Sequence, residues 1–257
     1  MKFLSRAATA CALLASLAVS APAARADDFS AAQKAQIGDI IRDYLLKNPE
    51  VLRDAMMEFD RRQKAAESAQ REQALDTLAP KIYNSRFQSV IGNPQGKITL
   101  VEFFDYNCGY CKKSLPDLVR LTKENSDLRV VLKDFPVLGP GSVEAAQVAS
   151  AVRNQLQGEK FWEFHQRLLM THGQVGKAQA IAAARESGVD LDRLDKDMKS
   201  ADIRNGIAET MQVADQLSLT GTPSWVLGKE VVIGAVGYDE LHDKLDNMKK
   251  CGKTACG

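Results

Sequence analysis

The sequence predicts an α/β fold in which one sheet and several helices share a core, with a helical segment inserted and a helical extension in front. Two runs rich in large and branched apolar residues, KITLVEFFDY at 97–106 and LRVVLKDF at 128–135, predict buried strands. Apolar residues at helical spacing fill most of residues 28–78 and 143–217. We therefore expect strands on both sides of a block of helices.

Residues 1–26 predict a signal peptide. Lys2 and Arg6 give a short positive start, and residues 7–21 are small and apolar but fewer than the ~20 that a membrane span needs. Residues 24–26 (ARA) have the small-x-small pattern of a cleavage site. The alternative, an uncleaved membrane anchor, is disfavoured by the shortness of the apolar run. We therefore expect the chain to be exported.

The rest of the composition limits the partners and sets the redox context. Residues 1–26 hold three of the 34 basic residues, which leaves 31 basic against 33 acidic residues and a net charge near −2. A nucleic-acid partner would require a basic patch or stripe, so we expect none. Cysteines at 108, 111, 251 and 256 remain. In an oxidising compartment an even number is expected to be paired or to cycle.

Residues 27–78 predict a helical stalk. One apolar stripe at helical spacing is formed by Ile37, Ile40, Ile41, Tyr44 and Leu45. Asn48 followed by Pro49 predicts that one helix ends and another begins. Residues 60–73 (DRRQKAAESAQREQ) keep helix-forming residues but lose the large apolar ones, which is typical of a solvated connector.

The amphipathic helices of this stalk are too short to fold alone, so their apolar faces need a cover. They can dock on the main domain of the same chain or on copies of themselves. Because the polar connector moves them away from the domain, we expect self-association and a homo-oligomer.

The main domain is predicted to span residues 79–257. A short strand is expected at 90–92, followed by the two buried strands. Three or four helices are expected in an insertion at about 138–217. The segments SWVLG and EVVIGAVG then predict a strand pair, and YDELHDKLDNMKK at 238–250 predicts a final helix. This order is typical of a thioredoxin-type core with a helical insertion.

Cys108 and Cys111 have a spacing that serves metal binding, a structural disulfide or redox exchange. The pair follows a buried strand, and the residues after it show helical spacing, so Cys108 is predicted at a helix N-terminus. Unpaired backbone N–H groups and the helix dipole favour a thiolate there, lowering the pKa from about 8.5 to between ~3.5 and 7.5. Cys111, one turn further on, is placed to resolve a mixed disulfide. This context favours a redox dithiol.

A second motif, GTPS at 221–224, lies just before the strand SWVLG. A strand, CGYC and a helix, followed by a Thr-Pro that opens a later strand, resemble the thioredoxin superfamily. The resemblance implies a cis peptide bond before Pro223 and a Thr222 carbonyl that faces the incoming polypeptide. Gly109 and Tyr110 complete the expected substrate-binding surface. The alternative is an ordinary trans proline in a turn.

The long helical block between the two motifs is similar to that of the DsbA family of periplasmic thiol–disulfide oxidoreductases, over about residues 85–250. This resemblance implies that Glu102 is a buried acid beneath the cysteines and transfers a proton to or from Cys111. Lys133 on the neighbouring strand is its candidate partner. The alternative is an exposed acid at a strand end.

Gly109-Tyr110 replaces the Pro-His that the best-known oxidase of this family has between its cysteines. Without that histidine, the reduced form should be less stabilised and the site a milder oxidant. A Gly-Tyr pair with a threonine before the proline is similar to the isomerase DsbC. The stalk with its KNPEVL restart resembles the ScsC-like (suppressor of copper sensitivity) subgroup, whose members can be trimers held by N-terminal helices and can act as isomerases.

These resemblances imply a periplasmic protein disulfide isomerase, trimeric by preference and linked to copper tolerance. A DsbA-like disulfide oxidase is the alternative. The expected partners are misfolded or reduced exported proteins and a membrane thiol-redox protein of the DsbD, ScsB or DsbB type. No cofactor is expected.

Cys251 and Cys256 are predicted to form a structural disulfide that caps the final helix, with a second redox pair or a metal-binding tail as alternatives. No metal site is predicted, because no histidine or further cysteine lies beside Cys108 and Cys111. A periplasmic copper or zinc chaperone and a client-binding holdase are the competing functions.

Overall fold

The structure is a computed structural model that describes residues 29–256. The described residues divide into two compact units, one that ends at Phe59 and one that begins at Asp60. The predicted signal peptide, residues 1–26, lies outside the described residues.

The first unit consists of helix α1 (Ala31–Lys47) and the beginning of helix α2 (Pro49–Tyr83). Ser30 caps α1: its side chain accepts a hydrogen bond from the backbone of Gln33, and the Gln33 side chain accepts one from the backbone of Ser30. The predicted break between the two helices is confirmed at Asn48. No residue of α1 is buried among the described residues, and most of its apolar side chains are exposed.

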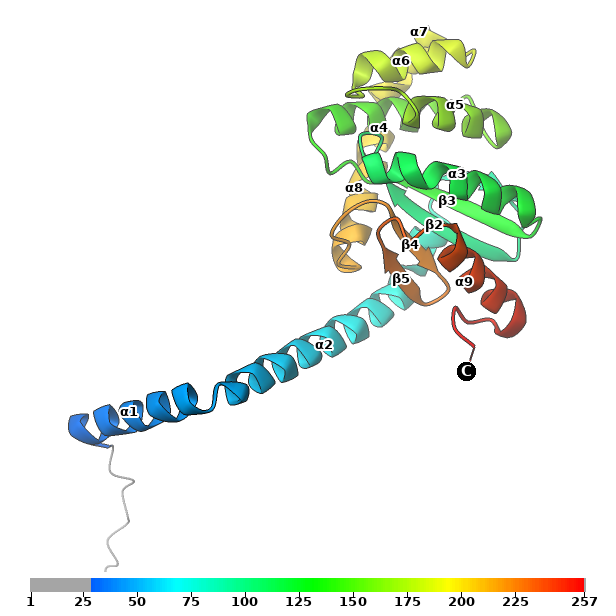
Figure 1. Ribbon diagram of the computed structural model, residues 1–257. Coiled ribbons are helices and arrows are strands. Elements are labelled where there is room, and N and C mark those ends of the chain that lie inside the picture. The colour runs from blue at the N-terminus through cyan, green and yellow to red at the C-terminus, as the bar shows by residue number, and fades with distance from the viewer. Residues whose placement is uncertain (1–28, 257) are drawn as a thin grey trace, which may run out of the picture. The chain divides into compact units, whose positions relative to one another are not determined.

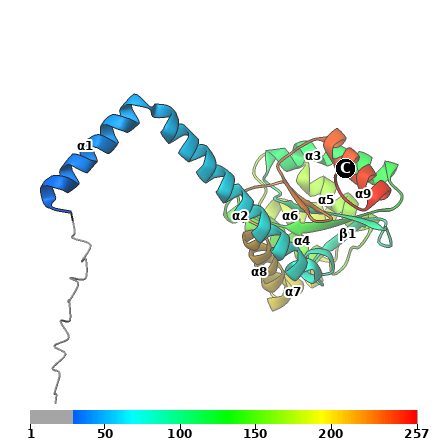
Figure 2. The same cartoon turned by 90° about the horizontal axis from the view of Figure 1, so that it is seen from below.

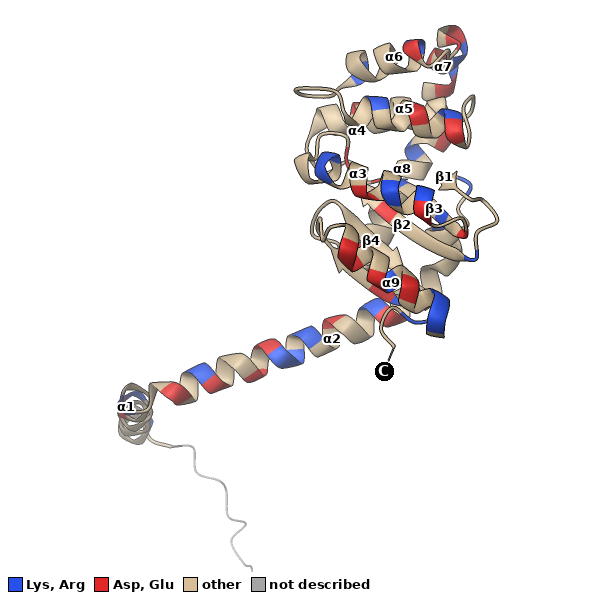
Figure 3. Ribbon diagram, turned by 45° about the vertical axis from the view of Figure 1, so that its right-hand side comes forward, with Lys and Arg blue, Asp and Glu red and all other residues tan. Residues whose placement is uncertain are grey.

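The charged middle of α2 is a solvated helix, as predicted. Lys and Arg alternate with Asp and Glu along it (Figure 3), and most of residues 60–73 are exposed. Leu75, Leu78 and Ile82 are then buried. The core of the second unit therefore begins before residue 79, where the sequence placed the domain boundary. These three residues have the spacing of one apolar helix face, which is absent from the polar run before them.

The second unit is built on a five-stranded mixed sheet with the order β1-β3-β2-β4-β5. Its strands are β1 (Ser89–Gly92), β2 (Ile98–Phe104), β3 (Leu128–Asp134), β4 (Ser224–Leu227) and β5 (Glu230–Ile233). Strands β2 and β3 are parallel, and the other neighbouring pairs are antiparallel. All the predicted strands are present.

The described part of the insertion holds five helices where the sequence predicted three or four. They are α4 (Pro140–Val152), α5 (Glu159–Leu169), α6 (Lys177–Glu186), α7 (Leu191–Met198) and α8 (Ala201–Gln216). Glycines mark the ends that were predicted, but the start of α8 is set by Ser200, whose side chain accepts from the backbone of Asp202. This capped boundary contains no glycine, which is why the sequence pattern did not separate α7 from α8.

The sheet has helices on both faces (Figures 1 and 2). One face packs with α3 (Gly109–Glu124), α9 (Tyr238–Cys251) and the insertion, through residues that include Leu100, Phe104, Leu132 and Trp225. The other face packs with α8 and the end of α2, through residues that include Val101, Phe103, Val131 and Val226. The alternation of neighbouring residues between the two faces decides which side chains can reach the cysteines.

Candidate active site

Cys108 lies where the chain passes from strand β2 into helix α3. It is the N-cap of α3, with an extended backbone (φ −77°, ψ 116°), and its Sγ accepts from the backbone N–H of Cys111 at 3.4 Å. The predicted position at a helix start is therefore confirmed. This position directs unpaired N–H groups and the positive end of the helix dipole at the sulfur.

The two sulfurs differ in acidity. Both cysteines are free thiols; Cys108 is 5% exposed and Cys111 is fully buried. Hydrogen bonds from the Cys111 thiol, the Thr222 side chain and the backbone of Cys111 and Tyr110 lower the pKa of Cys108 to about 5, although burial opposes this shift. Burial, together with the Cys108 and Glu102 charges, raises the pKa of Cys111. Near neutral pH, Cys108 is the thiolate and Cys111 the thiol.

A cis peptide bond faces the Cys108 sulfur. The Thr222–Pro223 bond is cis, as the resemblance implied. The Cys108 Sγ lies 3.1 Å from the Thr222 carbonyl oxygen, to which the thiol donates when it is protonated. Ser224 supports this turn, because its hydroxyl donates to the Gly221 carbonyl at 2.7 Å. The two motifs, more than a hundred residues apart in sequence, therefore meet at one sulfur atom.

Glu102 is a buried acid beneath the dithiol. Its side chain is on β2 and only 2% exposed, which excludes the alternative of an exposed strand end. Burial, with a smaller effect of the Cys108 charge, raises the pKa of Glu102 to about 8. The Glu102 charge in turn raises the pKa of Cys111, so the two groups interact. The carboxyl group is largely protonated at neutral pH.

The expected pairing of Lys133 with Glu102 is wrong. In the sheet register Glu102 lies opposite Leu132, whereas Lys133 lies opposite Phe103. Because side chains alternate between faces, Lys133 is on the other side of the sheet from Glu102. Its Nζ donates to the Lys81 carbonyl at 2.5 Å.

The loop before Cys108 is fixed by Asp105, which sequence reasoning missed. Its carboxylate accepts from the backbone of Asn107 (2.8 Å), Val137 (2.9 Å) and Leu138 (3.0 Å) and from the hydroxyl of Ser142 (2.7 Å). Four donors around one carboxylate explain how this acid can be buried. The Asp105 carbonyl also accepts from the backbone N–H of Cys108 at 3.0 Å.

Asn107 ties the same loop to the insertion. Its amide Nδ2 donates to the Val175 carbonyl at 2.8 Å, and its Oδ1 accepts from the Val175 N–H at 2.7 Å. The signal that could have found Asp105 and Asn107 is the run DYN directly before the first cysteine, since Asp and Asn side chains bond to nearby backbone.

A buried aromatic cluster supports the site from the insertion side. His165 of α5 is fully buried, and its Nδ1 lies 3.2 Å from the Tyr106 hydroxyl. Trp162 stacks on the His165 ring with centroids 5.5 Å apart, and Phe104 meets it edge-on at 4.7 Å. Burial lowers the pKa of His165 to about 3, so the ring is neutral and acts in packing.

Exposed side chains lie next to the dithiol in the chain and on the loop that Asp105 holds. Tyr110, between the two cysteines, is 63% exposed. Gly109 has open space on its Cβ side. Val137 and Leu138, whose backbone is held by Asp105, are also exposed. The structure thus places Gly109, Tyr110, Thr222 and Pro223 around Cys108, with Cys111 and Glu102 behind it.

The C-terminal cysteines are separate from this site. Cys251 and Cys256 form a disulfide with Cα atoms 6.2 Å apart, at the end of α9. Gly252 ends the helix in the left-handed conformation (φ 73°), and the side chain of Asn247 donates to the Thr254 carbonyl at 3.1 Å. The pairing is present as predicted, and its purely structural role stays a prediction.

Neither a metal centre nor a membrane span is found in residues 29–256. No three or more His, Cys, Asp or Glu side chains of this part of the chain are grouped so that they could hold a metal ion. No helix in it is both long and apolar enough to cross a membrane.

Comparison with curated proteins gives two kinds of relative. Na⁺/H⁺ antiporter NhaA 1 of Salinispora arenicola is 32% identical over 156 residues, which are 59% of this chain and 23% of that protein. The chain therefore spans about a quarter of the antiporter's length. Disulfide bond formation protein D of Bacillus subtilis is 22% identical over 177 residues, 63% of this chain and 78% of that protein.

Comparison with solved structures gives relatives that match two thirds or more of this chain. A thioredoxin-like oxidoreductase from Silicibacter pomeroyi has 35% identity and a TM-score of 0.63, and the match covers 67% of this chain and 98% of that one. A linker-deletion mutant of Proteus mirabilis ScsC has 28% identity and a TM-score of 0.65, covering 88% of this chain and 99% of that one.

Two family models match the chain in different places. The model of the DSBA-like thioredoxin domain matches residues 99–246, which contain both cysteines of the dithiol and the cis-proline. The model of the copper resistance protein ScsC N-terminal domain matches residues 33–66, within α1 and α2. Since the first match covers more than half of the chain, this protein belongs to the family of DSBA-like thioredoxin domains, here preceded by an ScsC N-terminal domain.

Proposed function

We propose that the protein is a thiol–disulfide oxidoreductase that exchanges disulfides with exported proteins through Cys108 and Cys111. The observation that carries this proposal is that two neighbouring cysteines beside a cis-proline have pKa values shifted in opposite directions. Cys108 has a pKa lowered to about 5, and its sulfur lies 3.1 Å from the Thr222 carbonyl. A thiolate is the attacking species in disulfide exchange, and the exposed Tyr110 follows this one closely in the chain.

The exchange begins when the Cys108 thiolate attacks one sulfur of a client disulfide. A bond forms between Cys108 and the client, the client disulfide breaks, and the second client sulfur leaves as a thiolate. If Cys111 then attacks the Cys108 sulfur, the client leaves fully reduced and two electrons have passed to it. If another client thiolate attacks instead, a different client disulfide forms and Cys108 is regenerated. The second outcome is isomerisation, with no net transfer of electrons.

Glu102 supports the step that uses Cys111. Cys111 has a raised pKa and must lose a proton before it can attack. The Glu102 carboxyl has a pKa of about 8 and is mostly protonated at neutral pH. Its ionised fraction accepts the proton of Cys111, and its protonated form returns one in the reverse direction.

Isomerisation is the direction we favour. Gly109 and Tyr110 place no cationic group between the cysteines, and most apolar side chains of helix α1 are exposed. Several dithiols held together by such helices would contact one misfolded client at the same time. We accordingly propose a homo-oligomer, with a trimer preferred, whose clients are misfolded exported proteins.

Oxidation is the second candidate, and one observation favours it. A Cys108 pKa of about 5 stabilises the reduced form, which makes the corresponding disulfide a better oxidant. In that case the clients are reduced exported proteins. The substitution of Pro-His by Gly-Tyr and the lowered pKa therefore point in opposite directions, and only a measured activity separates them.

We propose that the protein works in the periplasm, to which the signal peptide at residues 1–26 directs it before being cleaved. A membrane thiol-redox protein of the DsbD, ScsB or DsbB type would reset the dithiol after each net transfer of electrons. The match of residues 33–66 to the copper resistance protein ScsC N-terminal domain supports a contribution to copper tolerance.

Refolding of a scrambled-disulfide substrate tests the proposal. Two forms are compared, one starting at residue 27 and one starting at residue 60. The shorter form begins at residue 60 so that Leu75, Leu78 and Ile82 keep their places in the core. We expect the longer form to restore native disulfides and the shorter form to oxidise a reduced substrate without unscrambling it.

A Cys108→Ser variant is the control for chemistry. It should lose both activities, whereas a holdase would still suppress client aggregation with this substitution. If neither form unscrambles the substrate and both only oxidise, the isomerase proposal fails and the oxidase remains. If the wild-type protein has no redox activity, the proposal as a whole is wrong.

A further inference from the structure

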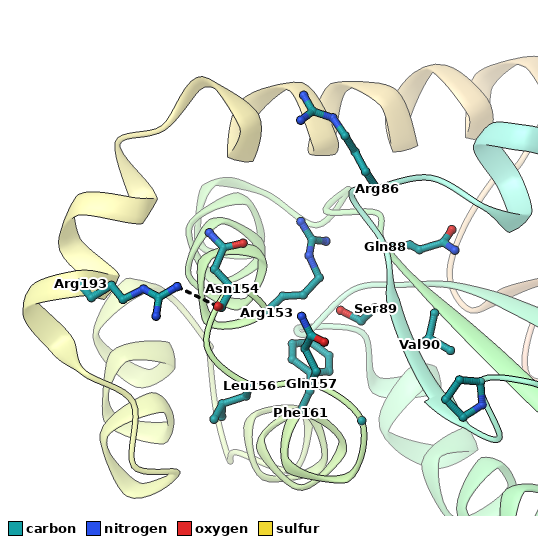
Figure 4. A pocket seen from close by; sticks show the side chains of 12 residues that line it. Arg86, Gln88, Ser89, Val90, Arg153, Asn154, Leu156, Gln157, Phe161 and Arg193 are labelled. Atoms are coloured by element: carbon teal, nitrogen blue, oxygen red, sulfur yellow. Dashed lines mark hydrogen bonds between the residues drawn. The ribbon is translucent and has the colours of Figure 1, made fainter.

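A second concave site lies at the edge of the sheet. It is a cavity of about 590 Å³ between edge strand β1 and the insertion. Figure 4 shows its walls: Ser89 and Val90 come from β1 on one side, and Arg153, Gln157 and Phe161 come from the insertion on the other. None of its lining residues belongs to the redox site.

The lining is basic and contains no acid. Arg86, Arg153 and Arg193 line the cavity together with the uncharged polar residues Gln88, Ser89, Asn154 and Gln157. Among the described residues, no Asp or Glu is part of this lining. Such a set of side chains offers mainly hydrogen-bond donors and positive charge, the features of a site for a carboxylate or phosphate group.

Two of the arginines have counter-ions outside the cavity. Arg86 forms an ion pair with Asp202 at 2.9 Å and, in Figure 4, extends toward helix α8 rather than inward. Arg193 lies 3.7 Å from Asp197 through Nε, and its Nη2 donates to the Asn154 carbonyl at 3.0 Å. The guanidinium of Arg193 is held in place beside the cavity.

Arg153 is the lining cation for which no ion pair is found among the described residues, although its charge interacts at longer range with that of Asp134. Its Nη1 donates to the Phe87 carbonyl, which is a neutral acceptor. Burial lowers the pKa of Arg153, as expected for a cation whose charge is incompletely compensated. A ligand that brings a negative charge to this guanidinium would supply an anion within ion-pair distance.

The remaining lining is apolar. Phe161 and Leu156, which are 3% and 8% exposed, contribute apolar surface from the insertion, and Val90 and Pro94 contribute it from the opposite side. A small inorganic anion would leave this apolar lining without contacts. The volume and the apolar lining fit a molecule with a body of several carbon atoms as well as a charged group.

We propose that this cavity binds an organic anion, with its carboxylate or phosphate group at Arg153 and Arg193 and its apolar body against Phe161. The same chemistry can come from two sources: a free small acid, or an acidic side chain of a polypeptide. The site is independent of the dithiol, so its ligand need not be a substrate of the exchange reaction.

Isothermal titration calorimetry on the purified protein tests the proposal with matched probes. The free probes are hexanoate, its neutral counterpart hexanamide, and inorganic phosphate. The peptide probes are acetyl-Leu-Glu-Leu-amide and acetyl-Leu-Gln-Leu-amide. We expect hexanoate or the Glu peptide to bind, and its neutral counterpart to bind at least about tenfold more weakly, the loss of one charge-assisted contact. Binding of hexanoate would identify a free small acid as the ligand, and binding of the Glu peptide would identify an acidic side chain of a polypeptide.

Two substitutions place the binding in this cavity. Arg153→Gln removes the charge of Arg153, and Gln157→Glu adds a carboxylate at an exposed lining position where folding is not at risk. Each should weaken binding of the anion at least about tenfold. Arg167→Gln on α5 is the matched control, because Arg167 forms a surface ion pair with Glu186 and lies outside the cavity; it should leave binding unchanged.

The proposal is overturned if neither hexanoate nor the Glu peptide binds, if each binds no better than its neutral counterpart, or if Gln157→Glu leaves the affinity unchanged. Binding of phosphate alone would also overturn it, because the apolar lining would then have no role.

Discussion

Cys108 ionises at a lower pH than an ordinary thiol, and the rate of alkylation measures this directly. In reduced protein, we expect reaction with iodoacetamide to rise through a midpoint near the pKa of about 5. Cys111→Ala removes the thiol that contributes most to this shift, so the midpoint should move upward. Cys111→Ser, which keeps a donor, should move it less. A wild-type midpoint near the ordinary thiol value of about 8.5 would contradict the assignment.

The same shift makes the stability of the reduced protein depend on pH. The pKa of Cys108 is lower in the folded chain than in the unfolded one, so the thiolate stabilises the fold. This contribution is fully present above the unfolded pKa of about 8.5. It is lost as the pH falls through the folded pKa of about 5. We expect the melting temperature of the reduced protein, relative to the oxidised one, to rise across this window in calorimetry. If the difference in melting temperature between the reduced and the oxidised protein did not change with pH, a lowered pKa of Cys108 would be excluded.

Glu102→Gln should separate the attack by Cys108 from the attack by Cys111. The amide cannot accept a proton, so release of a mixed disulfide at pH near 7 should slow by at least about tenfold, while alkylation of Cys108 changes little. Single-turnover release of a fluorescent peptide disulfide measures the effect. Lys133→Met is the control, because Lys133 lies on the other face of the sheet; it should not change the release rate.

Glu102→Gln should also stabilise the fold above mildly acidic pH. The pKa of Glu102 is raised to about 8 in the folded chain, above the unfolded value of about 4.3. As the pH rises from the unfolded pKa to the folded one, the unfolded chain releases the Glu102 proton while the folded chain keeps it. The free energy of unfolding therefore falls over this range. Thermal unfolding should show a gain for the variant at pH 7 and none near pH 4. If Glu102→Gln changed the melting temperature equally at pH 7 and pH 4, a raised pKa of Glu102 would be excluded.

At the level of residues, the sequence predicts those functional side chains that belong to a short motif of neighbouring residues. Cys108, Cys111, Thr222 and Pro223 were found because each belongs to a short motif next to an apolar run. Lys133 was misplaced because strand register decides the face, and register depends on pairing with a distant strand. Asp105 was missed because its four donors come from segments up to 37 residues away.

At the level of elements, the end of helix α2 is part of the catalytic unit. Leu78 is 6% exposed and packs in the core beneath the sheet. Leu78→Ala should lower the free energy of unfolding by about 2–5 kcal/mol, measured by urea denaturation of the form that starts at residue 60. Thr77→Ala, one position earlier and exposed, should change it by less than about 0.5 kcal/mol. Equal effects would mean that this part of α2 does not belong to the core.

Elements with strong periodicity were predicted well, and those defined by a single cap were not. Strands β2 and β3 are marked by runs rich in large and branched apolar residues, and the break between α1 and α2 by Asn48-Pro49. The boundary between α7 and α8 depends only on Ser200, and serine occurs too widely to mark a helix start without the structure. The domain boundary was placed too late because the charged run of α2 hides the return of an apolar stripe at Leu75.

At the level of the whole molecule, the N-terminal helices should set the oligomeric state. Ile40 and Leu52 are 67% and 55% exposed in the described chain, and such apolar groups need a partner surface. Replacing both with aspartate should lower the mass per particle in light scattering and remove isomerase activity, while oxidation of reduced substrate persists. Gln36→Asp, a charge added at an exposed polar position of α1, is the control. A mass unaffected by the double substitution would contradict self-association through these helices.

The chain has two tryptophans, and both are buried in the second unit: Trp162, stacked on His165, and Trp225, whose Nε1 donates to the Gly234 carbonyl at 3.0 Å. The protein therefore carries a natural optical label on its catalytic unit alone. Tryptophan emission will follow the melting of that unit, whereas far-ultraviolet circular dichroism will follow the helices of both units. Two separate transitions in one sample would show that the N-terminal helices unfold independently of the domain they precede.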